Sequence, residues 1–191
     1  MKKTNKKEII KIPNNIEAFF NKKTKTILFR SFAGQKSLQI HKQLMIYKKK
    51  QQIELTTENL KKLSNNHKKK IQLIQKTTAS LIKQLLIETT ALSYKKLKLI
   101  GVGYRAIPVE KFKDGLIFLK LGYSHPIYFK PPAETKIVSL RFTKLFLSSY
   151  SFFELTSVAA QIRLNKIPEP YKGKGILYEN EKIMLKEGKK I

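Results

Sequence analysis

The sequence predicts an α+β fold, because two stretches with helical periodicity each follow a series of short strand-like segments. The first stretch, residues 68–90, places apolar residues at three- and four-residue spacing among lysines. The second runs from Ser151 to Arg163. The segments before each stretch are rich in β-branched and aromatic residues and are separated by Gly, Pro and Asn, which is typical of strands and turns. A chain of 191 residues can form one larger domain or two small ones.

In the first half, the opening residues 2–11 are highly charged, and we expect them to be frayed. Strands are then predicted at residues 26–32, 38–40, 44–47 and 52–55. Residues 68–90 are predicted to form an amphipathic helix that covers the sheet made by these strands. Binding to a membrane surface is the alternative role for this helix. However, residues 68–90 contain no aromatic side chain that could insert into a membrane interface.

The second half opens with the segment Leu97–Ala106, which contains Gly101 and Gly103 at the spacing of a dinucleotide-binding turn. That motif requires a helix directly after the glycines. Here Pro108 follows, then the hairpin signal Asp114-Gly115 and a predicted strand. We therefore expect no cofactor, and we attribute the glycines to a strand bend or to a close approach of RNA.

Further strands are predicted at residues 116–122, 127–129 and 136–142. Ser151 and Glu154 have the spacing of a capping box, which predicts that a helix begins there and continues to Arg163. Ala159 and Ala160 would let this helix pack closely on a sheet.

No catalytic or metal site is predicted. Ser124 and His125 are adjacent, so on an extended chain their side chains point to opposite faces, and no carboxylate nearby in sequence would orient the imidazole. The three histidines are far apart, and the chain has no cysteine. We expect a protein that is not an enzyme and has no small-molecule substrate.

The charge of the chain points to a polyanionic partner. Lys and Arg number 40 against 13 acidic residues, a net charge of +27 spread over the whole sequence. Nucleic acid and an anionic membrane surface are the two candidates, and no apolar run has the length needed to span a bilayer. No helix-turn-helix or zinc pattern favours DNA, so we expect RNA as the specific partner, with nonspecific nucleic-acid binding as the alternative function.

The amino-acid usage suggests a genome rich in A and T. Lys outnumbers Arg 36 to 4, and Ile, Asn, Phe and Tyr are abundant. An organelle or a reduced bacterium would produce such usage, and the N-terminus has neither a secretory signal nor a convincing transit peptide.

A Pro-, Lys- and Gly-rich segment near the C-terminus is the strongest candidate site. Pro168 and Pro170 exclude a helix and favour an extended path. The segment that follows combines a stacking ring, two cations and two glycines, and its residues are Tyr171, Lys172, Gly173, Lys174 and Gly175. Such a composition suits the backbone and bases of RNA, although a solvated basic tail with turn glycines is the plain alternative.

Three strings carry a resemblance to a known family. They are Gly-Val-Gly-Tyr-Arg-Ala106, Leu-Gly-Tyr-Ser-His-Pro126 and Pro-Glu-Pro-Tyr-Lys-Gly-Lys-Gly-Ile176. In these the chain resembles ribosomal protein six of the large subunit (the universal L-six family, bacterial or organellar type). The resemblance is tight from Leu99 onward and loose before it, where the Gly-Pro-x-Gly turn and the His-Gly-Thr-x-Arg-like turn of the family are absent.

The resemblance implies two similar units, each a small mostly antiparallel sheet packed against one helix. We expect them at residues 1–92 (divergent) and 93–191, the second with a basic extended C-terminal arm. The implied function is a structural one, binding ribosomal RNA near the sarcin–ricin loop and the stalk base, beside neighbouring large-subunit proteins and without membrane insertion. The implied location is a ribosome in the mitochondrial matrix, with a plastid or a bacterial cytoplasm as alternatives.

The resemblance also extends the list of candidate RNA-binding residues. Beyond the segment already named, these are Arg163, Tyr104, Arg105, Tyr123, His125, Lys189 and Lys190.

Overall fold

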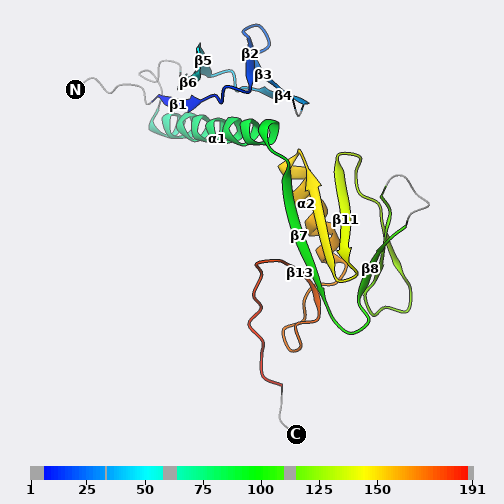
Figure 1. Ribbon diagram of the computed structural model, residues 1–191. Coiled ribbons are helices and arrows are strands. Elements are labelled where there is room, and N and C mark those ends of the chain that lie inside the picture. The colour runs from blue at the N-terminus through cyan, green and yellow to red at the C-terminus, as the bar shows by residue number, and fades with distance from the viewer. Residues whose placement is uncertain (1–6, 33, 58–63, 110–114, 189–191) are drawn as a thin grey trace. The chain divides into compact units, whose positions relative to one another are not determined.

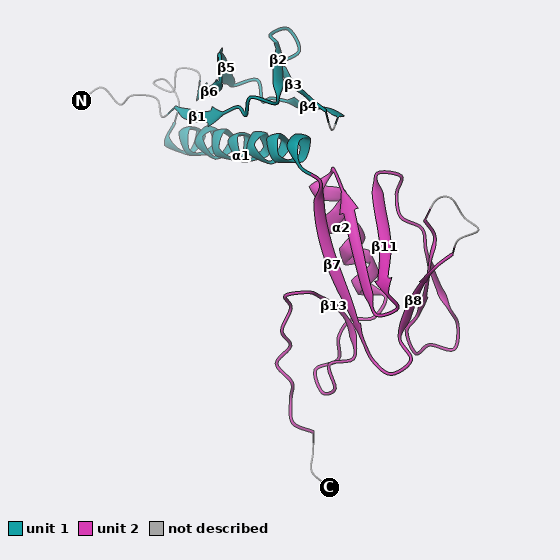
Figure 2. Cartoon of the chain, in the orientation of Figure 1, with its two compact units in different colours: residues 1–91 teal, residues 92–191 magenta. Residues whose placement is uncertain are grey.

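The computed structural model describes residues 7–32, 34–57, 64–109 and 115–188. The chain divides into two compact units, Met1–Ala91 and Leu92–Ile191, coloured separately in Figure 2. Each unit combines one α-helix with antiparallel strands in two small sheets, so the predicted α+β class is confirmed.

In its described residues, the first unit has six strands followed by a long helix (Figure 1). In chain order these are β1 (Glu8–Lys11), β2 (Glu17–Asn21), β3 (Thr26–Ser31), β4 (Gly34–Gln39), β5 (Leu44–Lys49), β6 (Gln52–Thr57) and α1 (Asn65–Thr90). The strands form two three-stranded antiparallel sheets, one in the order β1-β6-β5 and the other in the order β2-β3-β4. The helix contacts strands of both sheets.

The apolar stripe of α1 forms the core of this unit. Ile82 is fully buried together with Phe29 of β3 and Leu55 of β6. The Gln75 side chain is also buried, and its Nε2 donates a hydrogen bond of 2.9 Å to the Leu55 carbonyl. The helix predicted over residues 68–90 is therefore confirmed, and sheet packing stabilises it despite its many Thr and Ile residues.

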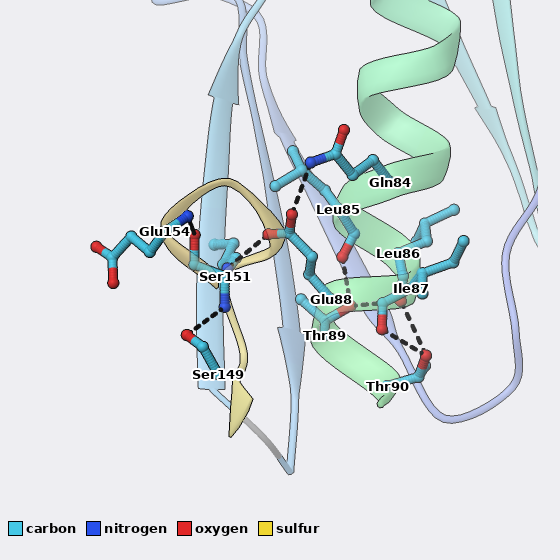
Figure 3. A network of polar contacts seen from close by, with 11 residues as sticks. Gln84, Leu85, Leu86, Ile87, Glu88, Thr89, Thr90, Ser149, Ser151 and Glu154 are labelled. Carbon is cyan, nitrogen blue, oxygen red and sulfur yellow. Dashed lines mark hydrogen bonds and ion pairs between the residues drawn. The ribbon is translucent and has the colours of Figure 1, made fainter. Parts of the chain in front are cut away.

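The last turns of α1 satisfy their polar groups locally (Figure 3). Gln84 Nε2 donates to Glu88 Oε1 at 2.8 Å, and the hydroxyl groups of Thr89 and Thr90 donate to carbonyls one turn earlier. Threonine hydroxyls that bond back to the helix in this way need no other partner inside a helix.

The second unit repeats the order of the first and adds one strand. Its elements are β7 (Ser93–Ile100), β8 (Arg105–Pro108), β9 (Ile117–Lys120), β10 (Ile127–Phe129), β11 (Thr135–Arg141), β12 (Lys144–Ser149), α2 (Phe152–Leu164) and β13 (Gly175–Tyr178). The sheet β11-β12-β7 corresponds to β5-β6-β1 of the first unit, and β10-β9-β8 corresponds to β4-β3-β2. Strand β13 pairs antiparallel with β7 and extends the larger sheet to four strands.

The α2 helix covers one face of the four-stranded sheet. Its buried residues Leu155, Val158, Ala159 and Ile162 share a core with the inward residues of β7, β12 and β13. Ser151 caps the helix, since its Oγ accepts a hydrogen bond of 3.4 Å from the Glu154 backbone nitrogen (Figure 3). This confirms the predicted start of the helix.

Two segments differ from the sequence expectations. Residues expected to be frayed include β1, in which Ile10 is buried and pairs with Ile53 of β6. Residues 168–175, for which the two prolines predicted an extended path, form a hydrogen-bonded turn that leads into β13. Short strands of this kind depend on pairing with residues distant in sequence, which periodicity does not reveal.

Candidate nucleic-acid interface

The Pro/Lys/Gly-rich segment folds into a closed turn between α2 and β13. The Glu169 carbonyl accepts a hydrogen bond of 2.9 Å from the Gly173 nitrogen, and the Glu169 nitrogen donates to the Lys174 carbonyl at 2.9 Å. The Ile176 nitrogen then bonds to the Lys166 carbonyl, also at 2.9 Å. The turn is thus held at its base on both sides.

Glycine is required at both of its positions in this turn. Gly173 has a φ of +68°, and Gly175 has a φ of +154°. A Cβ on Gly175 would lie 2.5 Å from the Cα of Pro168, closer than any real side chain approaches. The two glycines therefore shape the turn itself, which explains their presence without a ligand.

The chain beyond β13 returns to this turn and supports it. The Lys186 backbone nitrogen donates a hydrogen bond of 2.9 Å to the Pro170 carbonyl. A Cβ on Gly173 would be 3.4 Å from Leu185 Cδ2, so the Leu185 side chain lies against the turn. We call the resulting surface, formed by Glu169–Lys174 together with Leu185 and Lys186, the basic turn surface.

The basic turn surface presents its aromatic and cationic groups outward. The Tyr171 side chain is 54% exposed, and Lys172 and Lys186 are also exposed. Lys174 is half-buried. An exposed ring beside several ammonium groups provides both a stacking face and donors for phosphate oxygens.

A second group of candidate residues gathers around Tyr123. Its ring is parallel to that of His125, with centroids 5.8 Å apart, and Lys166 Nζ lies 4.3 Å from the Tyr123 centroid. The Tyr123 hydroxyl donates a hydrogen bond of 3.1 Å to the Asn165 carbonyl. These contacts fix the position of the tyrosine ring while leaving 40% of it exposed.

The two groups share one hollow. An open depression of about 440 Å³ is lined by residues of both groups, among them Tyr123, Lys166, Glu169 and Lys174. Tyr104, Leu164, Asn165 and Ile167 complete its lining. The structure therefore brings Tyr123 and Lys174, predicted separately from the sequence, into a single site.

Arg163, at the end of α2, is occupied within the protein. Its Nη2 and Nε donate to the Glu181 carboxylate at 2.6 and 3.2 Å, and its guanidinium lies 5.6 Å from the centroid of the Tyr178 ring. Through these hydrogen bonds Arg163 lowers the pKa of Glu181 below its ordinary value, and Glu181 raises the pKa of Arg163. The pair fastens the chain after β13 onto α2.

Tyr104 lies mostly in the core of the second unit. The residue is 8% exposed, and its ring lies against Gly101 and Gly122, where an added Cβ would be 2.9 and 3.1 Å from ring carbons. Strand β8 follows Gly101 and Gly103, where a dinucleotide-binding turn would have a helix. The glycines of this region thus make room for a tyrosine.

The remaining candidates lie apart from the hollow or beyond the described chain. Arg105 is exposed on β8, with its guanidinium 6.0 Å from the centroid of the Phe142 ring. Lys189 and Lys190 lie outside the described residues.

Comparison with known proteins identifies the family of the chain. No family model matches the sequence. The chain is 34% identical over 183 residues to large ribosomal subunit protein uL6 of Mycoplasmoides gallisepticum, covering 95% of this chain and 93% of that protein. This chain belongs to the uL6 family. It is 30% identical over 184 residues to the uL6 protein of Neisseria meningitidis, covering 96% of this chain and 97% of that protein.

A match over a shorter region has a higher sequence identity. The uL6 protein of Chlorobaculum tepidum is 50% identical over 95 residues, half of each chain. The resemblance predicted from the three sequence strings is thus confirmed, and the protein is a structural constituent of the large ribosomal subunit. In the described part of the chain, neither helix has the length and apolar character needed to cross a bilayer.

Two lysines of this candidate site were not predicted from the sequence. Lys166 lies just after α2, and Lys186 comes after β13. In the sequence neither lysine stands out from the many others that are spread over the chain. Their positions depend on the return of the chain to the turn, which no local pattern encodes. The proximity of Lys166 to the conspicuous Pro-Glu-Pro string was the one available signal.

Proposed function

We propose that this uL6 protein binds ribosomal RNA through the basic turn surface and the adjoining hollow around Tyr123. The observation that carries the proposal is the convergence of Tyr123, Lys166 and Lys174 on one depression beside the exposed Tyr171 and Lys172. Each supplies a group that RNA binding needs: rings for stacking and ammonium groups for phosphate oxygens.

The mechanism is recognition without chemistry. Lysines neutralise phosphates and release counterions, while the hydrogen-bonded turn presents them in a fixed arrangement. The turn is preorganised by its two bonds to Glu169 and by the Arg163–Glu181 pair, so little ordering is needed when RNA binds. Arg163 and Gly175 act in this scheme by holding the turn, and Tyr104 acts by supporting the Tyr123 side of the hollow.

The family resemblance suggests where this surface binds. We propose ribosomal RNA near the sarcin–ricin loop and the stalk base as its target, with neighbouring large-subunit proteins around it. The compact basic turn is suited to a folded RNA surface, because RNA helices are recognised mostly by shape and backbone.

The compartment is a separate part of the proposal. The preference for Lys over Arg, 36 to 4, supports an A/T-rich genome such as that of a mitochondrion, and we place the ribosome in the mitochondrial matrix. The relatives named above are bacterial, which makes the bacterial cytoplasm the rival location. Fractionation of the source cells followed by immunoblotting distinguishes the two.

The site is tested by reversing the charge of the turn. Lys172→Glu together with Lys174→Glu should strongly reduce incorporation into large subunits while the isolated protein stays folded. The matched control is Lys22→Glu with Lys23→Glu, an equal charge change at exposed lysines in the β2–β3 turn. Normal incorporation of the first double variant, folded by circular dichroism, would contradict the assignment of the turn.

A further inference from the structure

The four-stranded sheet of the second unit has a face that α2 does not cover. On β7 and β12 the residues Leu97, Leu99, Leu145 and Leu147 point toward α2 and are buried. The alternating residues point to the other face. Figure 2 shows α2 behind this sheet, with no other described element of the magenta unit in front of β7 and β12.

Two aromatic rings lie together on this open sheet face. Tyr94 of β7 and Phe146 of β12 stack with centroids 5.6 Å apart and an angle of 21° between their planes. The pairing of Tyr94 with Ser148, and of Phe146 with Lys96, makes the two rings diagonal neighbours across the strands. Tyr94 is 63% exposed, so its ring is available to a ligand.

Lysines surround the two rings. Lys96 and Lys98 alternate with the buried leucines on β7, and Lys144 lies opposite Lys98 on β12. Lys136 of β11 lies opposite Ser148, in the same cross-strand row as Tyr94. The acid that the structure places beside them is Glu179, whose Oε2 is 3.5 Å from Lys96 Nζ. The open face is thus basic, with an aromatic centre.

We infer that the open sheet face is a second RNA-binding surface, on which an unpaired nucleotide stacks on Tyr94 while lysines contact the flanking phosphates. A stacked aromatic pair on a sheet offers a base a flat apolar surface, and such stacking tolerates any base. Double-stranded RNA does not expose base faces, so the ligand is a single-stranded segment. This inference assumes the proposed ribosomal RNA ligand and assigns to it a second contact.

The charge of the face favours RNA over a protein partner. Exposed Val138, opposite Phe146, extends the apolar area onto β11, as a protein contact would also require. However, the four lysines around the rings would lose their hydration against an apolar protein surface, whereas phosphates replace it.

A tryptophan reporter tests the inference directly. The chain has no tryptophan, so Tyr94→Trp gives the purified full-length protein a single emitting residue on the open face. Titration with a single-stranded 12-nucleotide RNA should quench the tryptophan emission, excited selectively over that of the tyrosines, and the matching RNA duplex should not. Phe153→Trp on α2, where the native side chain is 75% exposed, serves as the control and should not be quenched. Unchanged emission from Trp at position 94 when the single-stranded RNA is saturating would overturn the inference.

A second pair of variants separates stacking from charge. Tyr94→Ala should weaken binding of the single-stranded RNA about tenfold without changing the salt dependence, since stacking contributes about 1–3 kcal/mol per base. Lys136→Ala with Lys144→Ala should instead reduce the slope of log K against log salt by about 1.4. Equal affinity of Tyr94→Ala and the native protein would contradict stacking. Failure of the protein to join large subunits would refute the proposed function and leave these oligonucleotide results unaffected.

Discussion

Gly175 lies directly against the backbone of Pro168. A Cβ on Gly175 would come within 2.5 Å of the Pro168 Cα and within 2.7 Å of the Pro168 nitrogen. This contact closes the basic turn at the point where β13 begins. The proline can pack there only because the residue opposite it is a glycine.

The first prediction concerns this contact. Gly175→Ala should separate Pro168 from β13 and lower the free energy of unfolding by more than about 1 kcal/mol, because both the space and the φ exclude a side chain. Hydrogen exchange of the Ile176 amide, measured by mass spectrometry, should accelerate because its bond to the Lys166 carbonyl weakens. Gly188→Ala is the control, since a Cβ there meets nothing within 4 Å. Equal protection of the Ile176 amide in both variants would contradict the account of the turn.

The second prediction separates packing from binding at Tyr104. Tyr104→Phe should retain stability and RNA affinity, because the ring is the part that packs against Gly101 and Gly122. Tyr104→Ala should lower the free energy of unfolding by about 3 kcal/mol by leaving a cavity. Urea unfolding and RNA titration provide the two measurements. A large loss of RNA affinity in a stable Tyr104→Phe protein would show that the hydroxyl contacts RNA.

The third prediction is a pH dependence from the Arg163–Glu181 pair. The pKa of Glu181 is lowered from its ordinary value of 4.5, chiefly by the hydrogen bonds from Arg163. The stability that this carboxylate contributes is therefore fully present above pH 4.5 and is lost as the pH falls through the lowered folded pKa.

Glu181→Gln measures that contribution. The variant should be less stable than the native protein by about 1 kcal/mol at pH 7, as expected for a half-exposed bidentate pair. The difference should shrink as the pH falls below 4.5, because the unfolded carboxylate is protonated first and the native carboxylate only at its lower folded pKa. Urea midpoints over the range from pH 7 to pH 3 provide the measurement, and a constant difference would contradict the role of the ion pair.

The fourth prediction concerns the ring at the hollow. Tyr123→Ala should weaken RNA binding about tenfold, because it removes both a stacking face and the partner of Lys166. Tyr123→Phe should lose only the 3.1 Å hydrogen bond to the Asn165 carbonyl and should bind nearly as well as the native protein. If the phenylalanine variant binds as weakly as the alanine variant, the hydroxyl rather than the ring face is the RNA contact.

The parts of the fold that local patterns encode were predictable. The apolar periodicity of residues 68–90 predicts the first helix and the cap at Ser151 predicts the start of the second, and the structure contains α1 and α2 at those places. The strands that were not predicted are β1, β2, β8, β12 and β13. Of these, β1 and β13 each depend on pairing with a strand far away in sequence. Taken alone, the sequence of Glu8–Lys11 resembles the rest of the charged N-terminal segment and does not indicate a strand.

The candidate site was predictable in composition and less so in geometry. Tyr171 and Lys172 are exposed as an RNA contact requires, and Tyr123 and Lys174 line one hollow. Sequence strings could not show that Arg163 pairs with Glu181 or that Tyr104 is buried, because both follow from tertiary packing. The open sheet face could not be predicted either, since Tyr94 and Phe146 lie about fifty residues apart in the sequence.

Sedimentation of a native lysate at moderate salt tests the central claim most directly. The chain should migrate with the large ribosomal subunit, and treatment with RNase should release it, because the proposed contacts are with ribosomal RNA. Migration as free protein, or with membranes regardless of RNase, would contradict the account.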